Sequence, residues 1–329
     1  MTERSSLNQV VQVGVEITPG TNVATTKRFQ SIGIEPSPTV ELDQFRPSGQ
    51  KFRSLATLNK EWVTAQIAGK PTYTELIYVL SSLIDTGTVT TPGGATLARN
   101  WQFIPDSFDD DTPITYTVEH GSSFRADKFN YGIVTETSFT FSRSSVELSG
   151  SMMGQAIQDS ITLTGSQTFL DLVPILPSEV SVYLDTTAAG LGGTQLSRVL
   201  SVEVGLSSRF APVWVLDASE SSFVAVIESE PDLSATMTME ADAEGMAQLT
   251  QMRAGSSAFL RIESTSTQEI DAATNNYLLT MDLAMKVSDT AGFSDSDGIY
   301  AVEWSFVGVH DGTWGQAFEV NVVNDLTAL

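Results

Sequence analysis

Hydrophobic and polar residues alternate with a period of two along most of this chain. Runs rich in Val, Ile, Thr, Phe and Tyr are separated by Gly, Pro, Ser and Asp, which is the pattern of strands that bury one face. Apolar residues at helical spacing are scarce by comparison. The pattern therefore predicts a mainly β protein with about two helices.

Two stretches do carry the spacing of a helix. The first covers 73–84, where the order of Thr72 and Glu75 matches a capping box at a helix start. The second covers about 243–253, and Gly255 is placed to end it. The apolar stripes that define these helices are Leu76, Leu80 and Leu83 in the first and Met246, Leu249 and Met252 in the second.

The alternating pattern of the first half returns in the second half. When Asn130 is set on Asn276, 146 positions later (276 minus 130), the strands that follow carry apolar residues on matching faces. On the opposite faces Glu136 falls on Asp282. A slip of one residue would exchange the two faces, so the match is sensitive to register. The matched apolar residues are Ile133, Phe139 and Phe141 against Leu279, Met285 and Val287.

This repeat predicts a duplicated chain of two β-rich domains, each with a helix. The first domain covers 1–160, a connecting segment with clustered Pro and Gly covers 161–197, and the second domain covers 198–329. The order strand, strand, helix, strands occurs in both, and we match 62–67 with 223–227, because each precedes a proline and a helix. Two domains also agree with the length of 329 residues.

Two stretches interrupt the strand pattern. The first, at about 35–60, contains Pro36, Pro38 and Pro47, and these prolines exclude it from the interior of a sheet. The second, 103–111, reads as an acidic surface loop. Long loops in a compact domain are usually functional or mobile, so the first stretch is a candidate contact with another molecule.

The net charge of the chain argues against nucleic acids and anionic membranes as binding partners. There are 40 acidic residues and 17 Lys and Arg, a formal net charge of −23. Such a chain gains no counterion release on phosphates and has no polybasic segment for an anionic membrane. No apolar run reaches the roughly 18 residues of a membrane span, and the first residues, 1–6, lack the apolar stretch of a signal peptide. We expect no membrane association and no secretory leader.

Candidate catalytic groups are few. Cysteine is absent, and His120 and His310 are the only histidines, each beside a strand end or turn. Segment 150–154 has its serine one place too early for a nucleophile elbow, and segment 190–193 lacks the lysine of a P-loop and the spacing of a dinucleotide motif. We therefore predict a protein that is not an enzyme and has no cofactor. Abundant Asp and Glu leave an acid-pair glycosidase open as a third alternative.

The acidic clusters 109–111 and 295–297 could offer oxygen ligands to Ca²⁺, but neither completes an EF-hand loop. We interpret both as solvated turns and predict no metal site.

Several short sequence blocks, spread over nearly the whole chain, together resemble those of a known protein family. They are Val13–Gly20, Lys27–Phe29, Ile34–Pro38, Phe45–Gly49, Asn59–Trp62, Tyr131–Glu136, Leu148–Gly154, Glu240–Met246 and Met252–Gly255. In their number and order these blocks resemble the major tail tube proteins of long, non-contractile-tailed bacteriophages of the siphovirus type. None of the blocks is a catalytic signature.

The resemblance implies two tandem tail-tube-like β-sandwich or barrel domains, each with a flanking α-helix. In this family, inner sheets of neighbouring domains join into a β-barrel ring, and rings stack into a tube that carries DNA and the tape-measure protein. Family rings usually contain six such domains, so a chain with two would form a trimeric ring with pseudo-sixfold symmetry. The implied location is the virion tail, made in the host cytoplasm, with the tail terminator and tail tip proteins as further partners.

Two sets of residues follow as candidate sites. Glu136 and Asp282 are the candidate acids of the lumen, where negative charge would repel double-stranded DNA and let it pass without sequence-specific binding. The candidate contact between rings is Pro36, Pro38, Phe45, Arg46 and Pro47.

The alternative function is that of a secreted carbohydrate-binding or adhesive β-sandwich protein. It predicts a signal peptide and a grouped aromatic face. The five Trp are instead spread over the whole chain, which favours roles as core and interface anchors.

Overall fold

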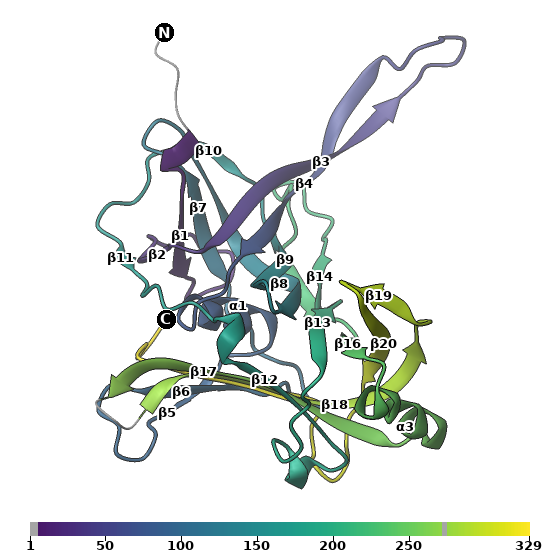
Figure 1. The fold of residues 1–329 in the computed structure, drawn as a ribbon. Helices are drawn as coiled ribbons and strands as arrows, with labels where there is room; N and C mark the ends of the chain where they lie inside the picture. Colours follow the sequence, from purple (N-terminus) through teal and green to yellow (C-terminus); the bar gives the residue numbers. More distant parts are fainter. Residues whose placement is uncertain (1–5, 272–274) are drawn as a thin grey trace.

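A computed structural model describes residues 6–271 and 275–329 (Figure 1). The chain is mainly β, as predicted: nineteen strands belong to one connected sheet system, and β14 (Phe210–Val213) and β15 (Ala225–Glu228) form a separate pair. Over the described residues the strands do not close into a barrel. The first five residues lie outside this description. They are part of the segment on which the expectation of no secretory leader is based.

Eight strands lie side by side and run from the first half of the chain into the second. We call them the central sheet, and every neighbouring pair in it is antiparallel. The two halves meet where β8 pairs with β13, with Phe139 opposite Val204. The order is β3 (Ile32–Phe45), β4 (Leu55–Gly69), β9 (Val146–Gly154), β8 (Ala126–Ser142), β13 (Val199–Ser207), β16 (Asp232–Glu240), β20 (Ile299–Gly308) and β18 (Asn275–Thr290).

The long strands β8 and β18 leave the central sheet at their N-terminal ends and pair there with other strands. Around β8 these are β7 (Tyr116–Gly121) and β10 (Gln158–Ile161), extended by β1 (Val10–Val15), β2 (Lys27–Phe29) and β11 (Thr168–Phe169). Around β18 they are β17 (Ser257–Asp271) and β21 (Phe318–Asn324), extended by β12 (Val180–Asp185), β6 (Arg99–Phe103) and β5 (Thr88–Thr90). The short β19 (Ser294–Ser296) pairs with β20.

Both predicted helices are present. The first is α1 (Glu75–Leu83), which is buried along its whole length and contacts β8. The second is two short helices, α2 (Ala243–Met246) and α3 (Gln248–Ala254), of which α3 contacts β18. Gly255 ends α3 with φ of 61°, a left-handed conformation that glycine adopts without strain. The remaining helical turns are the 3-10 turns Ser6–Asn8, Pro177–Glu179 and Ala188–Gly190.

The predicted capping box of α1 is half right. Thr72 Oγ1 accepts a hydrogen bond from the amide of Glu75 at 3.1 Å, as expected. The Glu75 carboxylate does not return to the start of the helix. It accepts bonds from the amides of Gln30, Ser31 and Ile32 at 2.5 to 3.3 Å and so joins α1 to the start of β3. Burial raises the pKa of this carboxyl.

The apolar residues of the two halves form one continuous core rather than two separate ones. Contacts between the halves are also polar: the Tyr73 hydroxyl lies 2.9 Å from Ser264 Oγ, and Asn324 Nδ2 donates to the Tyr73 carbonyl at 2.8 Å. Leu80 and Leu83 of α1 line one small apolar cavity together with strands β13, β18 and β21 of the second half. Separating the halves would therefore expose apolar surface.

Two details of the predicted repeat differ from the strand pairing. Segment 223–227, matched by sequence with 62–67 of β4, contributes to β15, which pairs only with β14 among the described strands. Segment 62–67 lies in β4, which pairs with β3 and β9, so the two matched segments have different kinds of partner. The connecting segment 161–197 contains β11, which pairs with β2, and β12, which pairs with β17.

Candidate functional site

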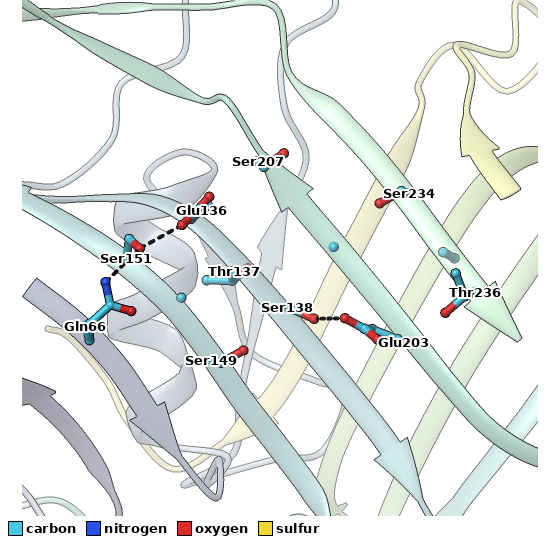
Figure 2. A pocket seen from close by; sticks show the side chains of 13 residues that line it. Gln66, Glu136, Thr137, Ser138, Ser149, Ser151, Glu203, Ser207, Ser234 and Thr236 are labelled. Carbon is cyan, nitrogen blue, oxygen red and sulfur yellow. Dashed lines mark hydrogen bonds between the residues drawn. The ribbon is translucent and has the colours of Figure 1, made fainter. Parts of the chain in front are cut away.

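One face of the central sheet is polar across both halves of the chain (Figure 2). Because successive side chains of a strand point to opposite sides, the buried apolar residues face the core and the residues between them share the other face. This face is hollowed into an open groove of about 390 Å³. The residues of this polar face that line it are Gln66, Glu136, Ser138, Ser149, Ser151, Glu203, Ser207, Ser234 and Thr236, and the buried Thr137 also borders it.

Hydrogen bonds between strands position two carboxylates on this polar face. Ser151 Oγ on β9 donates to Glu136 Oε1 on β8 at 2.7 Å, and Ser138 Oγ on β8 donates to Glu203 Oε1 on β13 at 2.7 Å (Figure 2). Both glutamates are exposed, and neither forms an ion pair with a described residue. The two negative charges therefore lie uncompensated on either side of the junction between the halves.

The strand registers extend this acidic character along the sheet. Glu35 lies opposite Gln66, Glu147 opposite Thr140, and Glu303 opposite Thr238, so all three belong to the same polar face. Strands β9, β13 and β16 contain no lysine or arginine, and neither does the part of β8 that pairs with β9. The groove lining holds two glutamates and no lysine or arginine, which produces a negative potential over the groove. Lys286 of β18 lies on the same face, opposite Val307 and outside the groove lining.

The two predicted lumen acids lie in different surroundings. Glu136 is exposed on the polar face, whereas Asp282 is only 5% exposed and lies on the part of β18 that pairs with β17 and β21. The Arg261 guanidinium binds the Asp282 carboxylate with both arms, at 2.6 and 2.7 Å, and this pairing raises the pKa of Arg261. Among the described residues the structure therefore brings Glu136 together with Glu203, which the sequence analysis did not single out. The only sequence signal for Glu203 is its polar place in an alternating strand.

The Pro-rich stretch, treated in the sequence analysis as a long loop, is a long two-stranded hairpin. Strands β3 and β4 extend well beyond the central sheet (Figure 1), and we call residues 40–58, which are all exposed, the arm. The predicted edge position is confirmed, because β4 is the only described strand paired with β3. The predicted contact residues Phe45, Arg46 and Pro47 lie at the tip, and Pro36 and Pro38 lie in β3 near the base.

The arm carries several large apolar side chains that are exposed to solvent. Its register places Leu42 opposite Leu58 and Phe45 opposite Leu55, so apolar pairs occur on both of its sides. Apolar surface gathered on a projecting element marks a contact with another molecule. The exposed apolar side chains of the arm are Val40, Leu42, Phe45, Phe52, Leu55 and Leu58.

The base of the arm is held by the second half of the chain. Trp62 packs edge-on against Trp214, with ring centroids 5.6 Å apart, and the Lys60 ammonium lies 5.1 Å from the Trp214 ring. The amide of Glu61 donates to the carbonyl of Ser221 at 2.8 Å. These contacts fix the direction in which the arm projects. Of the other tryptophans, Trp101 and Trp304 are buried, so they form no aromatic platform.

The two borders of the central sheet are open. On one side, the outer edge of β3 has no partner among the described strands. On the other, β17 pairs with β18 only as far as Lys286, so the last residues of β18, 287–290, have β20 on one side and no described strand on the other. Open strand borders expose unpaired amides and carbonyls that can pair with another chain.

The described residues contain no group of three or more His, Cys, Asp or Glu side chains that could hold a metal ion. Of the two clusters interpreted as solvated turns, Asp295 accepts the Gly298 amide at 2.8 Å within its own exposed turn. The interpretation is wrong for Asp111, whose side chain is buried and binds Arg209 at 2.6 Å. His310 lies edge-on to Phe108, and burial lowers the pKa of His120. The long apolar helix that a membrane span requires is not found in the part of the chain that the structure describes.

Comparison with known proteins does not assign the chain to a family. No protein-family model matches the sequence, and no curated protein matches it.

Proposed function

We propose that this protein is a structural subunit of a phage tail tube, which assembles side by side into rings and end to end into a tube. The observation that carries the proposal is the central sheet, which combines a polar, acidic face with two open borders. Lateral pairing of those borders would close a ring with the polar face toward its axis. The resemblance of the sequence blocks to tail tube proteins supports the same assembly.

The order of strand pairing supports a duplicated chain. In the first half β3, β4, β9 and β8 are neighbours. The N-terminal part of β8 pairs with β7, and β7 pairs with β1. In the second half β13, β16, β20 and β18 are neighbours. The N-terminal part of β18 pairs with β17, and β17 pairs with β12. The helix of each half follows β4 or β16 in sequence, precedes β7 or β17, and contacts β8 or β18. We therefore treat the halves as two copies of one tube domain.

The pairing also revises the register of the two copies. Pairing with β9 begins at Ile133 of β8, and pairing with β20 begins at Met285 of β18, 152 positions later (285 minus 133). The offset between the copies in the sequence match, Asn130 with Asn276, is 146 positions and so six residues smaller than this offset. Both shifts are even numbers, so the faces of the strands agree in either register.

The β8–β13 junction is a model for the contact between chains. It joins the last central-sheet strand of the first copy to the first strand of the second copy. The equivalent contact between molecules would join the end of β18 to the outer edge of β3 in the next chain. Three chains then supply six copies and a ring with pseudo-sixfold symmetry.

Assembly of the purified protein tests the proposal. We expect rings of three chains by analytical ultracentrifugation, and tubes with a central channel in negative-stain images. Six chains per ring would reject the duplication model, and a protein that stays monomeric at every concentration would reject the proposed function. In the virion, DNA and the tape-measure protein would occupy the channel, and the tail terminator and tail tip proteins would bind the ends of the tube.

Reversing the charge of the polar face should impair DNA passage without blocking assembly. In the Glu136→Lys, Glu203→Lys variant we expect tubes of normal appearance, because both side chains are exposed and away from the sheet borders. Infectivity of phage carrying the variant should fall about tenfold or more, since lysines in a confined channel attract phosphates. A plaque assay with complemented phage measures the effect.

The matched control for this experiment is Asp110→Lys, which changes charge by the same sign in the exposed loop after β6. It should leave infectivity unchanged. Unchanged infectivity in the Glu136, Glu203 variant as well would mean that the polar face does not line the channel.

A further inference from the structure

The turn region between β18 and β20 is larger than its counterpart in the first half and is exposed. We call residues 289–300 the β19 lobe. Phe293 and Tyr300 stack with ring centroids 4.7 Å apart, yet they are 54% and 60% exposed. Asp289 and Asp295 are exposed beside them, and neither forms an ion pair with a described residue. The lobe thus presents a preformed aromatic pair within negative charge at one border of the central sheet.

Complementary chemistry lies on β2 and β11, outside the central sheet, where β2 ends three residues before the border strand β3 begins. We call this surface, formed by Lys27, Arg28, Phe169 and Leu172, the β2 border. Lys27 and Arg28 of β2 are half-buried, and neither forms an ion pair with a described residue, which is notable in a chain with a net charge of −23. The Arg28 guanidinium lies 4.9 Å from the ring centroid of Phe169, which is 57% exposed. Leu172, also 57% exposed, follows in the same segment. In Figure 1, β2 and β11 lie on one side of the molecule and β19 on the opposite side.

The junction within the chain indicates that these two surfaces would meet. At the β8–β13 junction, Arg143 in the turn after β8 lines one groove with Val180 and Ser181 of β12. The counterpart of that turn is the β19 lobe, and the counterpart of β12 is β1, which pairs with β2. A second chain added in the same geometry brings its β2 border against the lobe of the first.

We propose that the β19 lobe binds the β2 border of a second copy of this chain, with Phe293 and Tyr300 packing near Phe169 and with Asp289 and Asp295 facing Lys27 and Arg28. The proposal rests on the proposed ring assembly and adds the surface that aligns one chain with the next. Complementary charges would select the head-to-tail arrangement, because two lobes or two β2 borders repel each other.

Charge reversal on each side, and on both, tests the contact. The variants are Asp289→Lys with Asp295→Lys, Lys27→Glu with Arg28→Glu, and the chain that combines all four changes. Asp297 is left unchanged because its φ of 52° suits aspartate better than lysine. Each pair alone should raise the protein concentration at half assembly about tenfold or more, and the combined chain should recover most of the loss. Sedimentation velocity measures the ring fraction, and circular dichroism verifies folding.

A second variant tests the aromatic pair without changing charge. Phe293→Ser with Tyr300→Ser should also weaken ring formation, whereas Phe108→Ser, which removes an 86% exposed phenylalanine from the loop after β6, should not. Rings that form equally well in all reversed and Ser variants would overturn this interface alone. A parent chain that forms no rings would overturn the proposed function and this interface together. Weakening by both single reversals without recovery in the combined chain would also overturn the charge pairing.

Discussion

Replacing Arg209 with alanine should lower the free energy of unfolding by about 3–5 kcal/mol, the usual cost of breaking a buried ion pair from one side. The Arg209 side chain is 1% exposed and binds Asp111 Oδ2 and Glu228 Oε1, each at 2.6 Å. It also donates to the carbonyls of Leu83 and Ile84 at the end of α1, at 2.9 and 3.0 Å. Alanine would leave the fully buried Asp111 carboxylate without its cation. Burial already raises the pKa of Asp111, and loss of Arg209 should raise it further.

Urea unfolding followed by tryptophan fluorescence measures this effect. The matched control is Arg198→Ala, which breaks an exposed ion pair with Glu240 and should cost less than about 1 kcal/mol. Adding Asp111→Asn to the Arg209 variant should recover part of the loss, because it removes the uncompensated charge. A loss no larger than that of the Arg198 control would show that the network does not hold α1 to the second half of the chain.

Shortening the arm should abolish tubes while leaving the subunit folded. Replacing residues 41–60 by Asn-Gly would join Val40 to Glu61, which are opposite each other in the hairpin, through a two-residue turn. The residues removed are almost all exposed, so thermal stability should change little. Tube formation should be lost, since the arm projects six exposed apolar side chains away from the central sheet, and contacts that do not close on themselves produce filaments.

Negative-stain images and sedimentation distinguish the outcomes of this deletion. We expect single rings and no tubes. A milder matched variant, Leu42→Ser with Leu58→Ser, keeps the hairpin and should shorten or destabilise tubes. Tubes of normal length in the shortened chain would contradict the role of the arm between rings, and loss of rings as well as tubes would place its contact within the ring.

Local signals in the sequence predicted the elements well. Alternation identified the β class, and helical spacing identified α1 together with the α2–α3 region, including the stop at Gly255. The prolines of β3 correctly predicted an edge. These features depend on residues close in sequence, such as the backbone limits of proline and the left-handed conformation of glycine.

The sequence did not distinguish the surroundings of the two candidate lumen acids. Glu136 lies on the exposed polar face, but Asp282 is paired with Arg261, and Glu203 takes the place beside Glu136. An exposed and a buried acid look alike in an alternating strand, because the partner comes from a distant segment. The same reason explains Glu75, whose expected bond to its own helix start is replaced by bonds to amides more than forty residues away.

By itself, the sequence determined the strand-rich class, the positions of the helices, the strongly acidic charge and the polar alternation of the central strands. The tertiary structure alone decided that β8 pairs with β13, that the halves share one core, and that the Pro-rich stretch projects as a paired arm. Alternation specifies which face of a strand is buried but not which strand lies beside it. That choice is made when backbone hydrogen bonds and apolar burial are satisfied over the whole chain at once.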